Sequence, residues 1–302
     1  MAELNLRCAE DLPGTDSKRL AACLAKVDDW SVLVDQYTRY SYPSFRKNPH
    51  RFRGSEARFR AMALAECLQR YVGIRYNFAF AEGEYDASDS RNLFIHGILT
   101  GFGGTCASMP VLYNAIGRRL GYPVTMGEAK EHYFCRWDDD SDEHFCFDAT
   151  SRGCTPRDED YYRRWPKQMT PVQEQMDGHI RPMTRREELA VFADARANCL
   201  FDNFQFVPAM EAYDLAHQIV PHKRTLNHSW GLAIYSVKLV AELTSLPDEL
   251  KDAPIEQTIG QAADKLCGPE VDLFRRHAVQ NVLRIVRNRR VRRRMATHPA
   301  AI

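Results

Sequence analysis

Hydrophobic residues recur at intervals of three and four near the start of the chain, from about Ser17 to Tyr40 and again from Ser55 to Val72. This spacing places apolar side chains on one face of an α-helix. Ser55 stands where its side chain can cap the second helix. The basic stretch YPSFRKNPHRFRG between the two segments favours a loop. We therefore expect a helical N-terminal region over residues 1–74, packed on the rest of the fold.

A third helical pattern runs from residue 109 to residue 120, where Gly121 and Pro123 supply a stop signal. The start of this helix is less regular, because Pro110 has no N–H and its ring crowds the carbonyl of Cys106. Cys106 therefore belongs to a distorted first turn or lies just before it. The predicted apolar face consists of Met109, Leu112, Tyr113, Ile116 and Leu120.

Short segments rich in aromatic and β-branched residues follow, with the sequences PVTMGEA, EHYFCRW and EHFCFDAT. They are typical of strands, and the acidic stretch DDDSD between the last two indicates a hairpin. Helical patterns then return from Arg185 to Arg294, with breaks expected near Pro208, Pro221, Pro247 and Gly268. We predict the α+β class, with the strands in a core over residues 75–180 and an all-α region over residues 181–302.

The composition excludes several classes of protein. The chain has 302 residues, of which 44% are hydrophobic and 27% charged, and a net charge of +1, as in ordinary globular proteins. Charges are spread through the first residues, unlike in a secretory signal peptide, and no apolar run reaches membrane-spanning length. Nine cysteines without regular spacing fit reduced thiols. We expect a cytoplasmic protein without a membrane partner.

The segment GFGGTCASM sets Cys106 behind three glycines and a threonine, next to the third helix. The glycines allow a tight turn, and backbone N–H groups at or near Cys106 would stabilise an oxyanion. A thiol beside an imidazolium or a helix N-terminus ionises more readily than a free thiol. Packing alone needs no such arrangement, so the segment indicates a nucleophile.

The predicted hairpin supplies partners for this thiol. If the chain turns about Asp140, then His132 faces Asp148 and both side chains project from the same side of the sheet. Directly opposed residues have Cβ atoms roughly 4.5–5.5 Å apart, which allows a carboxylate to accept a hydrogen bond from an imidazole. Cys106 would then attack an acyl carbon, His132 would move the proton and Asp148 would orient the imidazole.

The blocks GGTCASMPVLYNAIGRRLGYP, EAKEHYFCRW and HFCFDAT resemble the Cys, His and Asp blocks of the transglutaminase-like superfamily in order and in approximate spacing. The resemblance covers about residues 75–165. It implies a papain/transglutaminase-like core, in which the helix bearing the cysteine packs on an antiparallel sheet. It gives Cys106, His132 and Asp148 the roles of nucleophile, base and orienting group. The chain looks closer to bacterial members that end in tetratricopeptide-like helices than to the longer animal crosslinking enzymes.

The resemblance implies acyl transfer from an amide or peptide bond through a thioester. Water as the acceptor makes the protein a hydrolase or peptidase, and an amine makes it a transglutaminase. Some bacterial relatives have lost the nucleophile and serve non-catalytic roles, so a regulatory or partner-binding protein is the alternative. The expected substrate is the amide of a peptide or protein.

Further residues are assigned to substrate binding, although a structural role stays open for some of them. His96 either lines the pocket or is a satisfied structural histidine. The stretch YYRRWP forms a wall of the cleft or packs the strand end. The assigned residues are His96, Gly104, Thr105, Tyr133 and Trp165.

No cofactor and no metal site is expected. The acidic stretch from Asp138 resembles a calcium loop, but the required glycine and final glutamate are replaced by Glu143 and Ala149. The spacing of Cys135 and Cys146 does not fit zinc, and the predicted hairpin sets them on opposite faces.

The C-terminal region carries part of a tetratricopeptide pattern at Ala197, Ala209, Tyr213, Ala216 and Pro221. This region either binds a protein partner or covers the core. Seven arginines lie in residues 284–295, and such a run usually marks a solvated helix end. A nucleic-acid partner is not expected, because aromatic residues do not interleave with these arginines.

Overall fold

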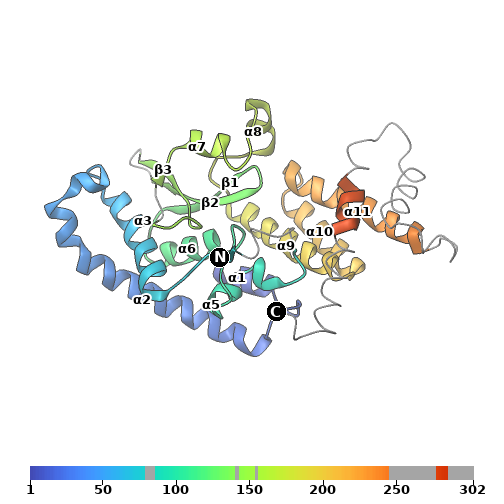
Figure 1. The fold of residues 1–302 in the computed structure, drawn as a ribbon, viewed down its shortest axis with the longest axis horizontal. Helices are drawn as coiled ribbons and strands as arrows, with labels where there is room; N and C mark the ends of the chain where they lie inside the picture. Colours follow the sequence, from blue (N-terminus) through green and yellow to red (C-terminus); the bar gives the residue numbers. More distant parts are fainter. Residues whose placement is uncertain (79–85, 140–142, 154–155, 245–276, 285–302) are drawn as a thin grey trace.

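The computed structural model describes residues 1–78, 86–139, 143–153, 156–244 and 277–284. Helices make up most of this part, and a small antiparallel sheet lies among them, so the structure has the α+β class (Figure 1). The elements are α1 (Ala2–Cys8), α2 (Ser17–Lys47), η1 (Pro49–Phe52), α3 (Glu56–Glu66), η2 (Cys67–Val72), η3 (Ser90–Asn92), α5 (Ile95–Leu99), α6 (Met109–Arg119), β1 (Val124–Ala129), β2 (His132–Asp138), β3 (His144–Phe147), β4 (Pro156–Arg157), α7 (Glu159–Arg164), α8 (Pro171–Asp177), α9 (Arg185–Asp202), α10 (Phe206–Ile219) and α11 (Arg224–Thr244).

The predicted basic loop after Tyr40 is largely wrong, because α2 continues through Pro43 to Lys47 and η1 follows at once. A proline inside a helix removes one backbone hydrogen bond. Here the last turns are held by aromatic packing, since Phe45 stacks on Phe59 of α3 with ring centroids 4.8 Å apart. The predicted cap of α3 is confirmed, because the Ser55 side chain accepts a hydrogen bond from a backbone N–H in the first turn.

The sheet has the antiparallel order β1-β2-β3-β4. Its register corrects the predicted hairpin: Cys135 opposes Phe147, and His132 pairs with Ala129 of β1 rather than with Asp148. The ladder is displaced by two residues, because Asp138 pairs with His144 and the side chain of Asp139 bonds Trp137 within the turn. Side chains alternate with a period of two along a strand, so this displacement leaves His132 and Asp148 on the same face.

The two faces of the sheet are covered by different parts of the chain. One face carries Cys135, Trp137, Phe145 and Phe147, which join the main hydrophobic core with α6. The other carries Phe134 and Cys146, which pack with Tyr162 of α7 and with the segments around α8. Figure 1 shows α7 and α8 on one side of the sheet and α6 on the other. The sequence patterns did not reveal α7, α8 or β4.

Helices α9, α10 and α11 form the C-terminal part of the described chain. Of the tetratricopeptide-pattern residues, Ala197, Ala209 and Tyr213 are buried in one cluster between α9 and α10, and Ala216 is buried as well. The assignment of this region as a tetratricopeptide unit stays a prediction. So do the domain boundaries at residues 74 and 180, because α1 and part of α9 share the main core with the sheet.

The predicted break near Pro208 is confirmed, since residues 203–205 separate α9 from α10 and Pro208 lies in the first turn of α10, where a missing N–H costs no helix bond. The break near Pro221 is confirmed, since residues 220–223 separate α10 from α11. The expected breaks at Pro247 and Gly268 lie outside the described residues, as does the arginine-rich segment beyond Arg284. Within the described chain, every helix is too short or too polar to cross a membrane.

Candidate active site

The turn that carries Cys106 is held by reciprocal hydrogen bonds on either side of it. The Thr105 hydroxyl accepts from the backbone N–H of Ala107 at 3.1 Å, and the Ser108 hydroxyl accepts from the N–H of Thr105 at 3.0 Å. The Thr105 hydroxyl also donates to the carbonyl of Asn92. Cys106 thus stands at the first turn before α6, half-buried, and its own N–H has no acceptor in the described part of the chain.

Gly104 fixes this turn to a neighbouring segment. Its N–H donates to the carbonyl of Arg75, and its carbonyl accepts from the N–H of Asn77. A Cβ at this position would lie 2.4 Å from a side-chain atom of Met109. Gly104 and the fully buried Thr105 therefore have contacts that favour a structural role, which leaves the N–H of Cys106 as the backbone donor next to the thiol.

His132 and Asp148 face one another although they are not opposed in the ladder. Imidazole Nε2 lies 3.4 Å from carboxylate Oδ1, and the two side chains are only 6% and 5% exposed. The alignment falls short of a good hydrogen bond, so the attraction is mainly electrostatic. The same Oδ1 accepts hydrogen bonds from the N–H and hydroxyl of Thr150, which fix the carboxylate.

The electrostatics connect Cys106 to this pair. Burial alone would lower the pKa of His132, but its contacts with Asp148 and Cys106 outweigh burial and raise the pKa to about 9. Burial likewise raises the pKa of Asp148, but the contacts with His132 and Thr150 hold it below its usual value. The pKa of His132 therefore depends both on Asp148, which Nε2 faces, and on Cys106.

Aromatic side chains cover the imidazole. The ring of Trp165 meets the ring of His132 edge-on, with centroids 4.6 Å apart, and Tyr162 lies farther away at 6.3 Å. Trp165 is 38% exposed, whereas Tyr162 is fully buried. Trp165 thus covers His132 on the solvent side, and the role of this stretch as a cleft wall stays a prediction.

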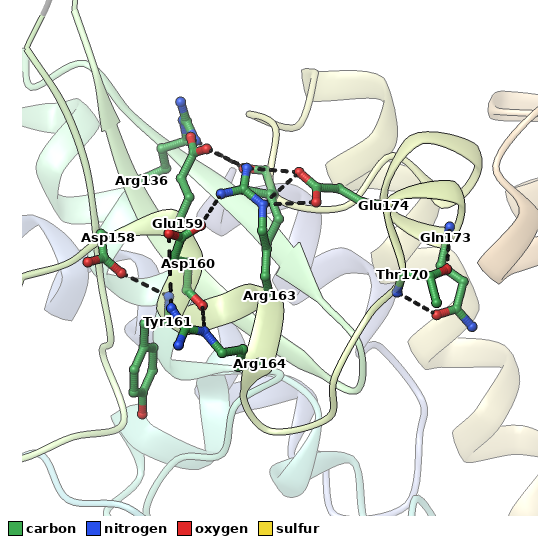
Figure 2. Close-up of polar contacts among 11 residues, drawn as sticks. Arg136, Asp158, Glu159, Asp160, Tyr161, Arg163, Arg164, Thr170, Gln173 and Glu174 are labelled. Carbon is green, nitrogen blue, oxygen red and sulfur yellow. Dashed lines mark hydrogen bonds and ion pairs between the residues drawn. The ribbon is translucent and has the colours of Figure 1, made fainter.

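The helix that precedes Trp165 is anchored by an ion-pair network (Figure 2). Arg136 of β2 donates to Glu159, and Arg163 donates to Glu159, Asp160 and Glu174. The network thereby joins the sheet, α7 and α8. Since Tyr162 lies within α7 and Trp165 directly after it, the network positions the cover over His132.

Two other predicted substrate residues lie elsewhere. His96 is buried, lies 3.2 Å from the Ser90 hydroxyl and lines a different cavity with Arg19 and Arg91. Burial lowers the pKa of His96 to about 4, so its ring stays neutral. Tyr133 projects from the opposite face of β2 to His132 and packs on the main core. A structural role fits both placements better than contact with substrate at Cys106.

Two residues near the site escaped the sequence analysis. Thr150 follows Asp148 by two positions, a spacing at which local side-chain hydrogen bonds are common, so the sequence contained a usable signal. Tyr76 forms a parallel bridge with Gly104. Burial and the charges of Cys106 and Asp148 raise the pKa of Tyr76 to about 12, which places its phenol near both. A bridge between distant segments leaves no local pattern.

The residues suited to metal binding do not form a site. In the described ranges, no three His, Cys, Asp or Glu side chains are grouped so that they would hold a metal ion.

Comparison with known proteins identifies a family for the chain. The sequence model of the transglutaminase-like superfamily matches residues 22–192, which is more than half of the chain and includes Cys106, His132 and Asp148. No curated protein and no solved structure matches the chain. From the family match, the chain belongs to the transglutaminase-like superfamily.

Proposed function

We propose that the protein is a cysteine-dependent acyl-transfer enzyme that acts on an amide or peptide bond through a thioester at Cys106. The observation that carries this proposal is the buried imidazole of His132, which faces Asp148 and whose pKa is raised by Asp148 and Cys106. This arrangement supplies a nucleophile, a proton carrier and an orienting group.

The proposed reaction has two steps. The thiolate of Cys106 attacks the carbonyl carbon, the C–N bond breaks, and His132 gives its proton to the leaving amine. The resulting thioester is then attacked by water, which His132 deprotonates, to yield a carboxylic acid and the free thiol. An amine in place of water would yield a new amide. The N–H of Cys106 donates to the oxyanion in both steps.

The charge state of His132 suits the first step. Its pKa of about 9 keeps the imidazole protonated near neutral pH. A cation beside a thiol favours attack by the thiolate. The imidazolium then holds the proton that the leaving amine needs. Water is the favoured acceptor, because hydrolysis requires no second binding site.

A non-catalytic binding protein is the second candidate, favoured by the cover over the imidazole. His132 has a side chain only 6% exposed beneath Trp165. The cover blocks approach across the imidazole. A substrate carbonyl would have to reach the half-buried thiol of Cys106 directly.

An activated aryl ester tests the two candidates directly. The protein is incubated with the ester and its intact mass is recorded over time. The enzyme should gain the mass of one acyl group, lose it on treatment with hydroxylamine, and lose the reaction altogether in Cys106→Ala. Cys146→Ala serves as the matched control and should react as the wild type does. Acylation that persists in Cys106→Ala, or no acylation at all, would support the binding protein.

We further infer that the protein works in a reducing compartment such as the cytosol. In support, the seven cysteines within the described residues are all free thiols.

A further inference from the structure

A cavity of about 710 Å³ opens beside the candidate site, between the sheet and the N-terminal helices. Three parts of the chain form it: Arg53 and Arg58 from the N-terminal region, the end of the sheet from His144 to Arg157, and the first turns of α7. Its walls combine guanidinium groups with the aromatic rings of Phe145 and Tyr161. Proposed acyl transfer requires no such basic cavity, so we asked what it would bind.

Arg58 is held in this cavity with one loosely placed counter-charge, Glu143. Its guanidinium lies over the ring of Phe145, 4.6 Å from the centroid, and its side chain is only 19% exposed. The carboxylate of Glu143 is 3.6 Å away, beyond a strong hydrogen bond. Burial and then the charge of Arg53 lower the pKa of Arg58. A partly buried cation beside a like charge is unfavourable, and a bound anion would relieve it.

Arg157 reaches the same cavity from the other side. Its guanidinium lies 4.7 Å from the ring centroid of Tyr161. Neither Arg157 nor Arg53 forms an ion pair with a carboxylate in the part of the chain that the structure describes. Arg163 differs from both: Figure 2 shows it surrounded by Glu159, Asp160 and Glu174, so its charge is already neutralised.

Tyr161 connects the cavity to the candidate site. It lines the cavity, and its ring centroid is 5.4 Å from that of Trp165, which in turn contacts His132. Burial raises the pKa of Tyr161, and the charge of Asp148 adds to the effect. Cys146, also in the cavity wall, precedes Asp148 by two residues. A ligand that contacts Tyr161 in the cavity would therefore be separated from the imidazole by the rings of Tyr161 and Trp165.

We propose that this cavity binds carboxylate side chains of an acidic peptide segment next to the amide on which the enzyme acts. The position of the reacting amide rests on the proposed function, whereas the binding of carboxylates in the cavity does not. Planar guanidinium groups match carboxylates in a bidentate geometry, and the aromatic floor accommodates the aliphatic part of a peptide.

The charge pattern favours a peptide over nucleic acid. Asp158, Glu159 and Asp160 border the cavity at the start of α7. A phosphate backbone tracks a continuous basic groove, whereas these acids interrupt the basic lining. Glu159 and Asp160 are already paired with Arg163, so they oppose a separate carboxylate less than a continuous backbone. Isolated carboxylates can instead reach Arg53, Arg58 and Arg157 singly.

Peptide binding to the Cys106→Ala protein tests the proposal without turnover. A fluorescently labelled peptide that carries several Glu residues is compared with its Gln counterpart by anisotropy at low salt. The acidic peptide should bind at least about 10-fold more tightly. The double variant Arg53→Gln with Arg157→Gln should remove this difference, whereas the neutral peptide should be unaffected.

The matched control is Arg51→Gln with Arg164→Gln, which removes the same charge from exposed positions outside the cavity. It should retain the preference for the acidic peptide, and thermal unfolding should show that both double variants fold. Equal binding of the two peptides to the parent protein would overturn the proposal. An equal loss of the preference for the acidic peptide in both double variants would also overturn it. So would displacement of the labelled peptide by a single-stranded oligonucleotide at a lower concentration than unlabelled acidic peptide requires.

Failure of the site and failure of the proposed function give different results. Loss of ester acylation at Cys106 with normal peptide preference would contradict acyl transfer and leave the binding site in place. Normal acylation with no peptide preference would contradict the binding site and leave acyl transfer in place.

Discussion

The two faces of the sheet differ in chemistry although both are buried. The face on α6 is apolar, and even its cysteine behaves as a packing residue: the thiol of Cys135 lies 3.7 Å from the carbonyl of Pro110. The face under α7 carries His132, Arg136 and Asp148, which are between 4% and 9% exposed. One face thus consists of hydrophobic contacts, and the other combines the hydrophobic cluster around Phe134 with paired charged residues.

This difference separates stability from chemistry within one small sheet. Burying apolar surface stabilises the fold without any directional requirement. Burying charges is costly unless each has a partner, and a fold keeps such groups where they have a use. The polar face is therefore where we place function, and the apolar face is where we place most of the stability.

The largest expected difference is between two cysteines. Cys106→Ala should reduce acylation by about 10³-fold or more, because the nucleophile is lost. Cys146→Ala, on the polar face but away from the imidazole, should leave the rate within about two-fold. Rates of ester acylation by intact mass measure both. Similar rates for the two variants would contradict the division between nucleophile and packing residue.

On the apolar face, Phe147→Ala should destabilise the fold by about 3–5 kcal/mol, because the ring is fully buried. Urea unfolding followed by tryptophan fluorescence measures the loss. The fraction that remains folded should still acylate at the wild-type rate. A large loss of activity with little loss of stability would show that the apolar face also serves the chemistry.

Glu159→Gln should cost about 1–2 kcal/mol, because it removes the charge that Arg136 and Arg163 share. Asp160→Asn is the control. The side chain of Asp160 also pairs with Arg163, but it is exposed to solvent, so the pair should contribute about 0.5 kcal/mol or less. We also expect the Glu159 variant alone to shift the emission of Trp165, since α7 positions that ring. Equal stability of the two variants would argue against the network as an anchor.

A further prediction concerns the dependence of stability on pH. The folded pKa of His132, about 9, lies above the ordinary value of 6.5, so protonation of this residue stabilises the fold below pH 6.5 and the contribution is lost as the pH rises through 9. The stability of the wild type relative to His132→Gln should therefore fall across this window. The lowered pKa of Asp148 acts only in acid and does not interfere. A difference independent of pH would contradict the raised pKa.

The sequence was informative where a local pattern determines the structure. The helix of residues 109–120, the cap at Ser55 and the first three strands follow from hydrophobic period and turn residues, and α6, α3 and β1–β3 are found close to those places. The three candidate residues followed from the block pattern around Cys106, His132 and Asp148, and the structure brings them together.

The remainder depended on contacts between distant segments. The two-residue shift of the hairpin arises from side-chain bonds of Asp139 in the turn, which hydrophobic alternation does not encode. The continuation of α2 through Pro43 depends on Phe59, which is contributed by another helix. Helix α7 is short and highly charged, and it is held by ion pairs with Arg136 and Glu174 rather than by an apolar stripe.

The reactivity of the thiols tests the central claim most directly. The folded protein is treated with iodoacetamide at about pH 6, where ordinary thiols are almost entirely protonated, and labelling is followed by peptide mapping. We predict that Cys106 reacts well ahead of the other eight cysteines and that His132→Gln removes this advantage. Labelling of Cys106 at the same rate as the other cysteines, in a protein shown to be folded, would contradict the account.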